Sequence, residues 1–143
     1  MTDDDRLKTQ RLKKRDALIG MGIDPYGGRF ADVQPSAMVR QKAEGLDLQP
    51  GARSAVTAGV AGRIILLRIM GKLAFLTIRD ASGTLQFGIS QGDIGDGWPI
   101  LKELDLGDII GGDGVLGRTK TGELTLWCNG LTVLAKSLQP PPE

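Results

Sequence analysis

Three side chains near the middle of the chain have the chemistry needed to bind a flat heterocycle. Phe75 offers an aromatic ring, Gln86 an amide that both donates and accepts hydrogen bonds, and Arg68 a cation. Phe75 and Gln86 lie in two runs of alternating residues that flank a turn at residues 80–83. Stacking of an unpaired base on such a ring contributes about 1–3 kcal/mol, and an amide can read a base edge. The three residues together predict a small site for a single nucleic-acid base.

Strand alternation predicts that Phe75 and Gln86 share one face of a hairpin, because successive side chains point to opposite faces. The opposite, apolar face consists of Ala74, Leu76 and Ile78 in the first run and of Leu85, Phe87 and Ile89 in the second. If residues 80–83 close the hairpin, Phe75 lies opposite Gly88 and Thr77 opposite Gln86. Because Gly88 has no side chain, we expect the ring of Phe75 to be free for stacking. The alternative is that a loop covers Phe75 and that Gln86 is an ordinary exposed residue.

Composition limits the chemistry that this chain can perform. Its 143 residues are enough for one domain with an extension, and the net charge is only +1. Nucleic-acid binding would therefore depend on local patches rather than on an overall basic field. The absence of histidine and the single Cys128 argue against a zinc site and an internal disulfide, and Cys128 is expected in or near the core. No apolar run is long enough for a signal peptide or a membrane span, so we expect a cytoplasmic protein.

The pattern of strands and turns predicts a mainly β fold. The expected strands are residues 54–67, 73–79, 84–90, 108–118 and 123–128, with 131–136 continuing the last one. A short helix at residues 98–106 would separate the third strand from the fourth. Three strands, a helical connection and two more strands form a five-stranded OB-fold, a Greek-key barrel. Gly59 and Gly62 would allow the long first strand to bend, and the 21 glycines suit a small, twisted β domain.

Two helices are expected ahead of the barrel. The first covers residues 6–21, with three aspartates at its start and a thin apolar stripe. It would lie on another surface with Arg11 and Lys14 facing outward, or else be a solvated, charged helix. The second covers residues 36–45, with Ser36 as a possible cap.

Turn residues divide the chain into three parts. Residues 1–50 form an N-terminal helical extension and linker, residues 51–138 the barrel, and residues 139–143 the start of a further linker. The proline-rich end is stiff and is expected to lead to another domain.

Six short phrases carry a resemblance to a known family. They are residues 22–26 (Gly-Ile-Asp-Pro-Tyr), 60–63 (Val-Ala-Gly-Arg), 68–72 (Arg-Ile-Met-Gly-Lys), 106–111 (Leu-Gly-Asp-Ile-Ile-Gly), 119–124 (Thr-Lys-Thr-Gly-Glu-Leu) and 136–138 (Lys-Ser-Leu). In this order they resemble the N-terminal anticodon-binding domain of class II lysyl-tRNA synthetase. The sister synthetases for aspartate and asparagine share the fold, but the phrases at 68–72 and 119–124 favour lysine. Leu67, Gly112-Asp113 and Pro141 depart from the pattern of the family.

The resemblance implies a role for each candidate residue. Phe75 would stack on the central uridine of the anticodon, Gln86 and Arg68 would hydrogen-bond that base, and Glu123 would help to read a flanking base. Lys72 and Lys120 lie within the matching phrases and are further candidates for binding. Arg11 and Lys14, on the first helix, would be available for backbone phosphates.

The resemblance also implies partners and cofactors. The partners would be the tRNA(Lys) anticodon stem-loop and a downstream class II catalytic domain, in a full-length homodimer. ATP and Mg²⁺ would bind the full-length lysine–tRNA ligase, and no cofactor is expected in this chain. Because the chain lacks the class II catalytic motifs, we expect it to be inactive in aminoacylation by itself. The alternatives are a general single-stranded nucleic-acid binder and an interaction domain that uses Leu73, Trp98 and Trp127.

Overall fold

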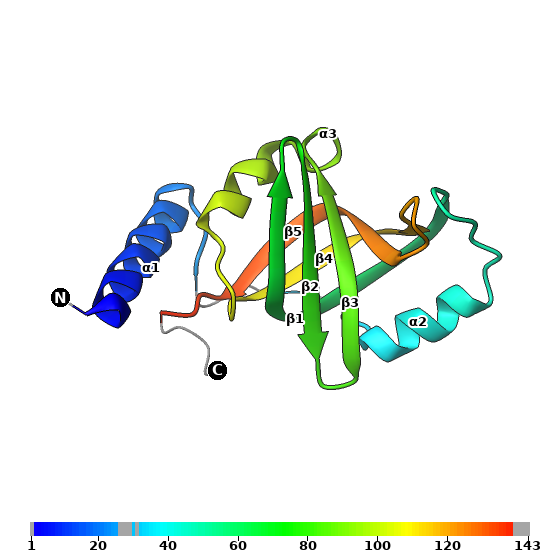
Figure 1. Cartoon of the computed structure of the whole chain (residues 1–143), viewed down its shortest axis with the longest axis horizontal. Helices are drawn as coiled ribbons and strands as arrows, with labels where there is room; N and C mark the ends of the chain where they lie inside the picture. The colour runs from blue at the N-terminus through cyan, green and yellow to red at the C-terminus, as the bar shows by residue number, and fades with distance from the viewer. Residues whose placement is uncertain (1, 26–29, 31, 139–143) are drawn as a thin grey trace.

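The computed structural model describes residues 2–25, 30 and 32–138, in which five strands form a closed barrel (Figure 1). The elements are α1 (Asp3–Gly20), α2 (Ser36–Glu44), β1 (Arg53–Met70), β2 (Leu73–Asp80), β3 (Gly83–Ser90), α3 (Gln91–Ile94), the 3-10 helix η1 (Gly95–Glu103), β4 (Ile109–Arg118) and β5 (Leu124–Ala135). The order around the barrel is β1-β2-β3-β5-β4, with β3 and β5 parallel and the other pairs antiparallel. The predicted five-stranded OB-fold is confirmed. Tyr26 and the predicted linker at 139–143 lie outside the described residues.

The first strand serves both halves of the barrel. Its beginning pairs with β4 and its end with β2, and Arg63 takes part in both ladders. Gly62 lies at this crossing, where a side chain would collide with the backbone carbonyl of Arg79. The close approach of β2 therefore requires glycine at this position.

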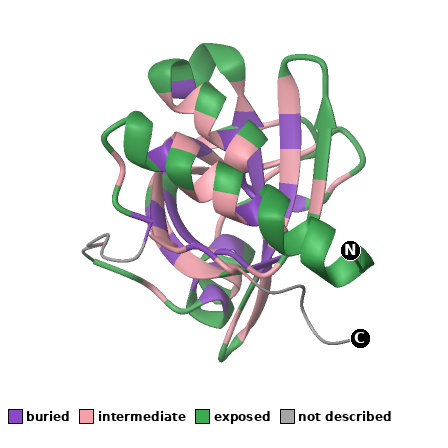
Figure 2. Ribbon diagram, turned by 90° about the vertical axis from the view of Figure 1, so that its left-hand side faces the viewer, coloured by how far each residue is buried: buried purple, intermediate pink, exposed green. Residues whose placement is uncertain are grey.

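Alternating residues of the strands fill the interior of the barrel. Figure 2 shows buried residues on the strands of the barrel and exposed residues mainly on helices and turns. The predicted core residues Ala74, Leu76, Ile78, Leu85, Phe87 and Ile89 are all buried. Cys128 is also buried, and its desolvation, together with the charge of Asp113, raises the pKa of its thiol. The thiol therefore remains protonated and serves as a small core residue.

Helix α1 packs against the barrel through basic side chains that were expected to face outward. The guanidinium of Arg11 is buried and donates to the backbone carbonyls of Leu106 at 3.0 Å and Ser137 at 3.2 Å. The Nζ atom of Lys14 lies 2.7 Å from Oδ1 of Asp105. The prediction that these two residues form an open basic face is therefore wrong. Their long side chains bridge the helix to polar groups at the end of the barrel instead.

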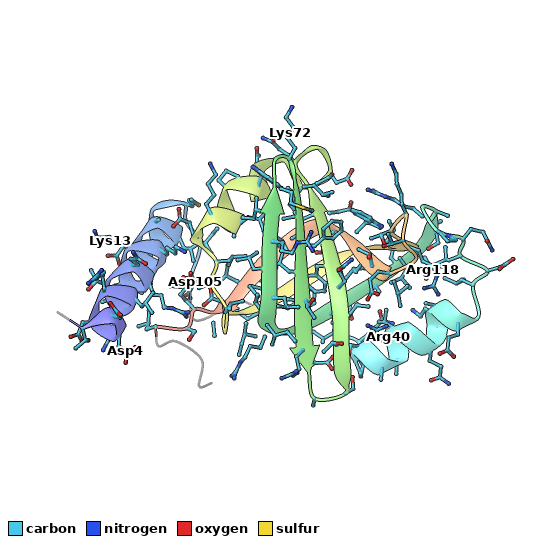
Figure 3. All side chains as sticks on the ribbon, viewed as in Figure 1. Asp4, Lys13, Arg40, Lys72, Asp105 and Arg118 are labelled. Carbon is cyan, nitrogen blue, oxygen red and sulfur yellow. The ribbon has the colours of Figure 1, made fainter. Side chains whose placement is uncertain are left out.

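A buried ionic cluster joins this region together. Nζ of Lys136 lies 2.8 Å from Asp105 and 2.7 Å from Asp108, and the side chains of Lys136 and Asp108 are fully buried. Asp108 also accepts hydrogen bonds from the backbone N–H groups of Asp105 and Ser137. Burial of Asp105 opposes its ionisation, but the hydrogen bonds from Lys136 and Lys14 outweigh this and lower the pKa of Asp105. Figure 3 shows Asp105 between α1 and the barrel.

Helix α2 is capped from a distant part of the chain. Ser36 is its first residue rather than its cap, and both its N–H and its hydroxyl donate to Asp80 at 2.7 Å. Asp80 also accepts from Ser82 and Gly83 within the β2–β3 turn. Although burial opposes ionisation, these hydrogen bonds lower the pKa of Asp80 to about 2. The predicted cap at Ser36 is thus wrong, because a carboxylate 44 residues away supplies the acceptor.

The helical connection between β3 and β4 starts earlier than predicted. It consists of α3 and η1 and spans residues 91–103 rather than 98–106. Pro99 within this segment cannot donate a backbone hydrogen bond, which disfavours a regular α-helix. Within the described ranges, no helix combines the length and apolarity needed to cross a bilayer.

Candidate nucleic-acid interface

Two rows of paired residues cross the outer face of β1, β2, β3 and β5. The first row contains Leu66, Thr77, Gln86 and Thr125, and the second contains Arg68, Phe75, Gly88 and Trp127. Phe75 therefore lies opposite Gly88, and Thr77 opposite Gln86, as the alternation predicts. The structure also places Arg68 directly beside Phe75 on the neighbouring strand.

A shallow depression of about 280 Å³ lies over this face. Its lining residues come from three strands and the β4–β5 loop: Leu66, Arg68, Phe75, Thr77, Gln86, Thr119, Thr121 and Glu123. Four of the predicted site residues, Arg68, Phe75, Gln86 and Glu123, thus line one surface feature. We call it the outer-face depression. It combines an aromatic ring, an amide, a cation and a carboxylate, which are the groups required to stack and orient a base.

The ring of Phe75 is held from one side by Trp127. Their ring centroids are 6.0 Å apart, with an angle of 67° between the planes, which is an edge-to-face contact. A Cβ atom on Gly88 would lie 2.7 Å from the ring of Trp127. Gly88 therefore makes room for Trp127, and does not simply leave empty space beside Phe75 as the sequence suggested.

Trp127 is itself fixed by a cation. The guanidinium of Arg53 lies 4.2 Å from the centroid of its ring. Arg53 also pairs with Asp93 at 2.8 Å. This hydrogen bond, with a second one from Ser90, lowers the pKa of Asp93. Trp127, one of the possible interface residues, is thus held by contacts within this domain. It supports the ring of Phe75 in the outer-face depression.

Gln86 is anchored by a neighbour on β5. Its Nε2 donates to Oγ1 of Thr125 at 3.0 Å, and this hydroxyl donates in turn to the carbonyl oxygen of Glu123, also at 3.0 Å. Thr125 is fully buried. The amide of Gln86 therefore has a defined position at the floor of the depression.

The basic residues predicted to bind RNA lie in different parts of the structure, and only some of them are near the outer-face depression. Arg68 is exposed within the outer-face depression, and its Nη2 lies 3.3 Å from the sulfur of Met70. Lys120 is exposed between two lining residues of the β4–β5 loop. Lys72 is exposed at the β1–β2 turn, where Figure 3 shows it projecting away from the barrel. Arg11 and Lys14 lie instead at the contact between α1 and the barrel.

Leu66 also lines the depression, although it is not among the site residues predicted from the sequence. It is 62% exposed although it is apolar, and it pairs with Thr77 across β1 and β2. A register shift between Ile64 and Leu66 interrupts the simple alternation of β1. The signal that was available is its position two residues before Arg68, which puts both on the same face.

A second, larger depression of about 870 Å³ offers less suitable chemistry. Its charged lining residues are Asp32, Asp113 and Lys42, so carboxylates outnumber cations. A nucleic-acid backbone would be repelled by this balance of charge. Across the part of the chain that the structure describes, no group of three or more acidic, cysteine or histidine side chains is placed to hold a metal ion.

Comparison with known proteins agrees with this geometry. Residues 59–134 match the tRNA anticodon family model, which is described as an OB-fold nucleic acid binding domain. Among curated proteins, the chain is 42% identical over 96% of its length to a lysine–tRNA ligase of Synechococcus sp. (strain CC9311). It is 38% identical over 99% of its length to one of Anaeromyxobacter dehalogenans (strain 2CP-C), and 42% identical over 96% to one of Roseiflexus castenholzii (strain DSM 13941 / HLO8).

These relatives are much longer than the matched region. The chain spans 28% of the length of each of the three ligases. The family match covers 76 of the 143 residues, from the first part of β1 almost to the end of β5. The chain therefore belongs to the tRNA anticodon family of OB-fold nucleic acid binding domains.

Proposed function

We propose that this chain is a tRNA-binding module that recognises the lysine anticodon, as one part of a class II lysine–tRNA ligase. The observation that carries the proposal is the gathering of Phe75, Gln86, Arg68 and Glu123 around the outer-face depression. The names of the similar ligases support lysine as the amino acid concerned.

Four of the lining residues contact the anticodon in this proposal. Phe75 stacks on the central uridine of the anticodon, and Gln86 and Arg68 hydrogen-bond its edge. Glu123, which is exposed in the β4–β5 loop, contacts a flanking base. Lys72 and Lys120 supply charge to the RNA backbone at the margins.

The remaining activities belong to the longer protein in this proposal. Aminoacylation, with its ATP and Mg²⁺, takes place in a class II catalytic domain that follows this module, and the module alone is inactive. The full-length protein acts as a cytoplasmic homodimer. The chain spans little more than a quarter of the similar ligases, which supports its role as one part of a longer protein.

The proposal predicts that Phe75→Ala weakens binding of an RNA hairpin that carries U-U-U in the anticodon position of its loop. The loss expected is about 1–3 kcal/mol, because the stacking surface is removed. Isothermal titration or fluorescence anisotropy would measure it. Leu73→Ala is the matched control, since Leu73 lies on the same strand and face but does not line the depression. Equal affinity of wild type and Phe75→Ala would contradict the proposal.

Changing the RNA separates an anticodon reader from a general single-strand binder. A reader loses affinity when the central uridine of the loop becomes cytidine, because the hydrogen-bonding groups on the base edge change. A general binder relies on stacking and backbone charge and binds both hairpins equally. Equal binding would therefore favour the general binder over the proposed function.

A further inference from the structure

The orientation of the Gln86 amide is determined by a hydrogen-bond relay. Thr125 has one hydroxyl hydrogen, and this hydrogen is donated to the carbonyl oxygen of Glu123 at 3.0 Å. The hydroxyl can therefore only accept from Gln86, which requires the Nε2 end of the amide to face it at 3.0 Å. If the amide were flipped, Oε1 of Gln86 would face Oγ1 of Thr125. No hydrogen bond could form between them, because the hydroxyl hydrogen of Thr125 is already donated to Glu123. The relay thus fixes which end of the amide faces the barrel.

The relay is protected from water and tied to the loop beside the depression. Thr125 is fully buried, so water does not compete for its hydroxyl. The carbonyl of Glu123 also accepts from the backbone N–H of Thr119, at 3.0 Å. The hydroxyl therefore joins the floor of the outer-face depression to its β4–β5 wall.

A fixed amide has a fixed preference among bases. With Nε2 held by Thr125, Gln86 keeps its Oε1 acceptor and one N–H for a ligand. A uracil carries a donor at ring nitrogen N3 with carbonyl acceptors on both sides, which complements this arrangement. A cytosine carries a lone pair at N3, which opposes Oε1 when the base is held in the same stacked position on Phe75. A reversed amide would accept the cytosine instead.

We propose that Thr125 is a positioning residue that fixes the amide of Gln86 and thereby sets the preference for uracil over cytosine at the base stacked on Phe75. This inference rests on the proposed function and adds a buried residue that does not touch the RNA. It predicts that specificity, rather than overall affinity, depends on the hydroxyl at position 125.

The test compares Thr125→Val with Thr125→Ser in the full 143-residue chain. Valine keeps the shape but loses the hydroxyl, whereas serine keeps the hydroxyl. Dissociation constants are measured for RNA hairpins with U-U-U and U-C-U in the loop. We expect wild type and Thr125→Ser to prefer the uridine hairpin by about tenfold or more, and Thr125→Val to reduce this ratio about fivefold. An unchanged ratio in Thr125→Val, or a ratio lost equally in Thr125→Ser, would overturn the inference.

The outcomes separate this inference from the proposed function. If wild type itself binds both hairpins equally, anticodon reading fails and the role of Thr125 fails with it. If wild type discriminates and Phe75→Ala binds weakly, the function stands, and the comparison of Thr125→Val with Thr125→Ser decides the inference.

A second measurement applies if the valine variant does not fold. NMR of the free wild-type chain would resolve the two side-chain amide protons of Gln86, identified by their loss in Gln86→Glu. One proton shifted by a persistent hydrogen bond, and retained in Thr125→Ser, supports the relay. Two protons with the shifts of a free, solvated amide would overturn it.

Discussion

At the scale of single residues, the stacking surface depends on side chains behind it. Trp127 contacts the ring of Phe75 edge-to-face, and Arg53 lies over Trp127 at 4.2 Å. Asp93 holds Arg53 by an ion pair at 2.8 Å. The four residues come from β2, β5, β1 and α3, so distant parts of the barrel hold one ring in place. Such preorganisation reduces the entropy that is lost when a ligand binds.

This contact predicts that Trp127 reports on binding. In a Trp98→Phe variant, Trp127 is the remaining tryptophan, and its emission should change when the U-U-U hairpin is added. The reason is that a base stacked on Phe75 lies beside a ring whose centroid is 6.0 Å away. Fluorescence titration measures the change, with Phe75→Ala in the same background as the control. If the emission of Trp127 stays constant while fluorescence anisotropy shows that the hairpin binds, the RNA binds away from the outer-face depression.

At the scale of elements, local patterns predicted the hairpin well. The pairing of Phe75 with Gly88 follows from the period of two along each strand and the short turn at 80–83. The position of Trp127 could not be derived in this way, because it depends on the parallel pairing of β3 with β5, which are distant in sequence. The burial of Arg11 was missed for a related reason, since its carbonyl partners are 95 and 126 residues away.

The capping of α2 shows the same limit and leads to a prediction about pH. Asp80 accepts from Ser36 and from its own turn, and its pKa is lowered from 3.8 to about 2. A carboxyl with a lowered pKa in the folded state stabilises the protein above its unfolded pKa, and this stabilisation is lost as pH falls through the folded pKa. The contribution of Asp80 should therefore be complete above about pH 4 and vanish towards pH 2.

Replacing Asp80 by Asn tests this linkage. Near neutral pH, Asp80→Asn should lower the free energy of unfolding by about 1 kcal/mol, since solvent partly screens the carboxylate. The difference from wild type should shrink between pH 4 and pH 2. Urea denaturation at several pH values measures it, with Asp96→Asn as an exposed control. A difference that does not depend on pH would mean that the charge of Asp80 does not stabilise the cap.

At the scale of the whole molecule, the chain combines a near-neutral net charge with strongly localised charges. The formal charge is +1, yet Lys136, Asp105 and Asp108 meet where α1, the segment before β4 and the segment after β5 come together. Basic residues on α1 therefore help to attach this helix to the barrel, in addition to contributing to the net charge. In the proposed function, the groups that remain exposed around the outer-face depression are the ones that contact RNA.

The buried cluster predicts a large effect of a single substitution. Lys136→Met should lower the free energy of unfolding by about 3–5 kcal/mol, because Asp108 would stay buried without its cation. Adding Asp108→Asn should recover part of this loss, since the uncompensated charge is removed. The exposed pair of Arg6 and Asp3 provides the control, and Arg6→Met should change stability by less than about 0.5 kcal/mol. Urea denaturation measures all three variants, and equal small effects of Lys136→Met and Arg6→Met would show that the buried cluster does not stabilise the fold.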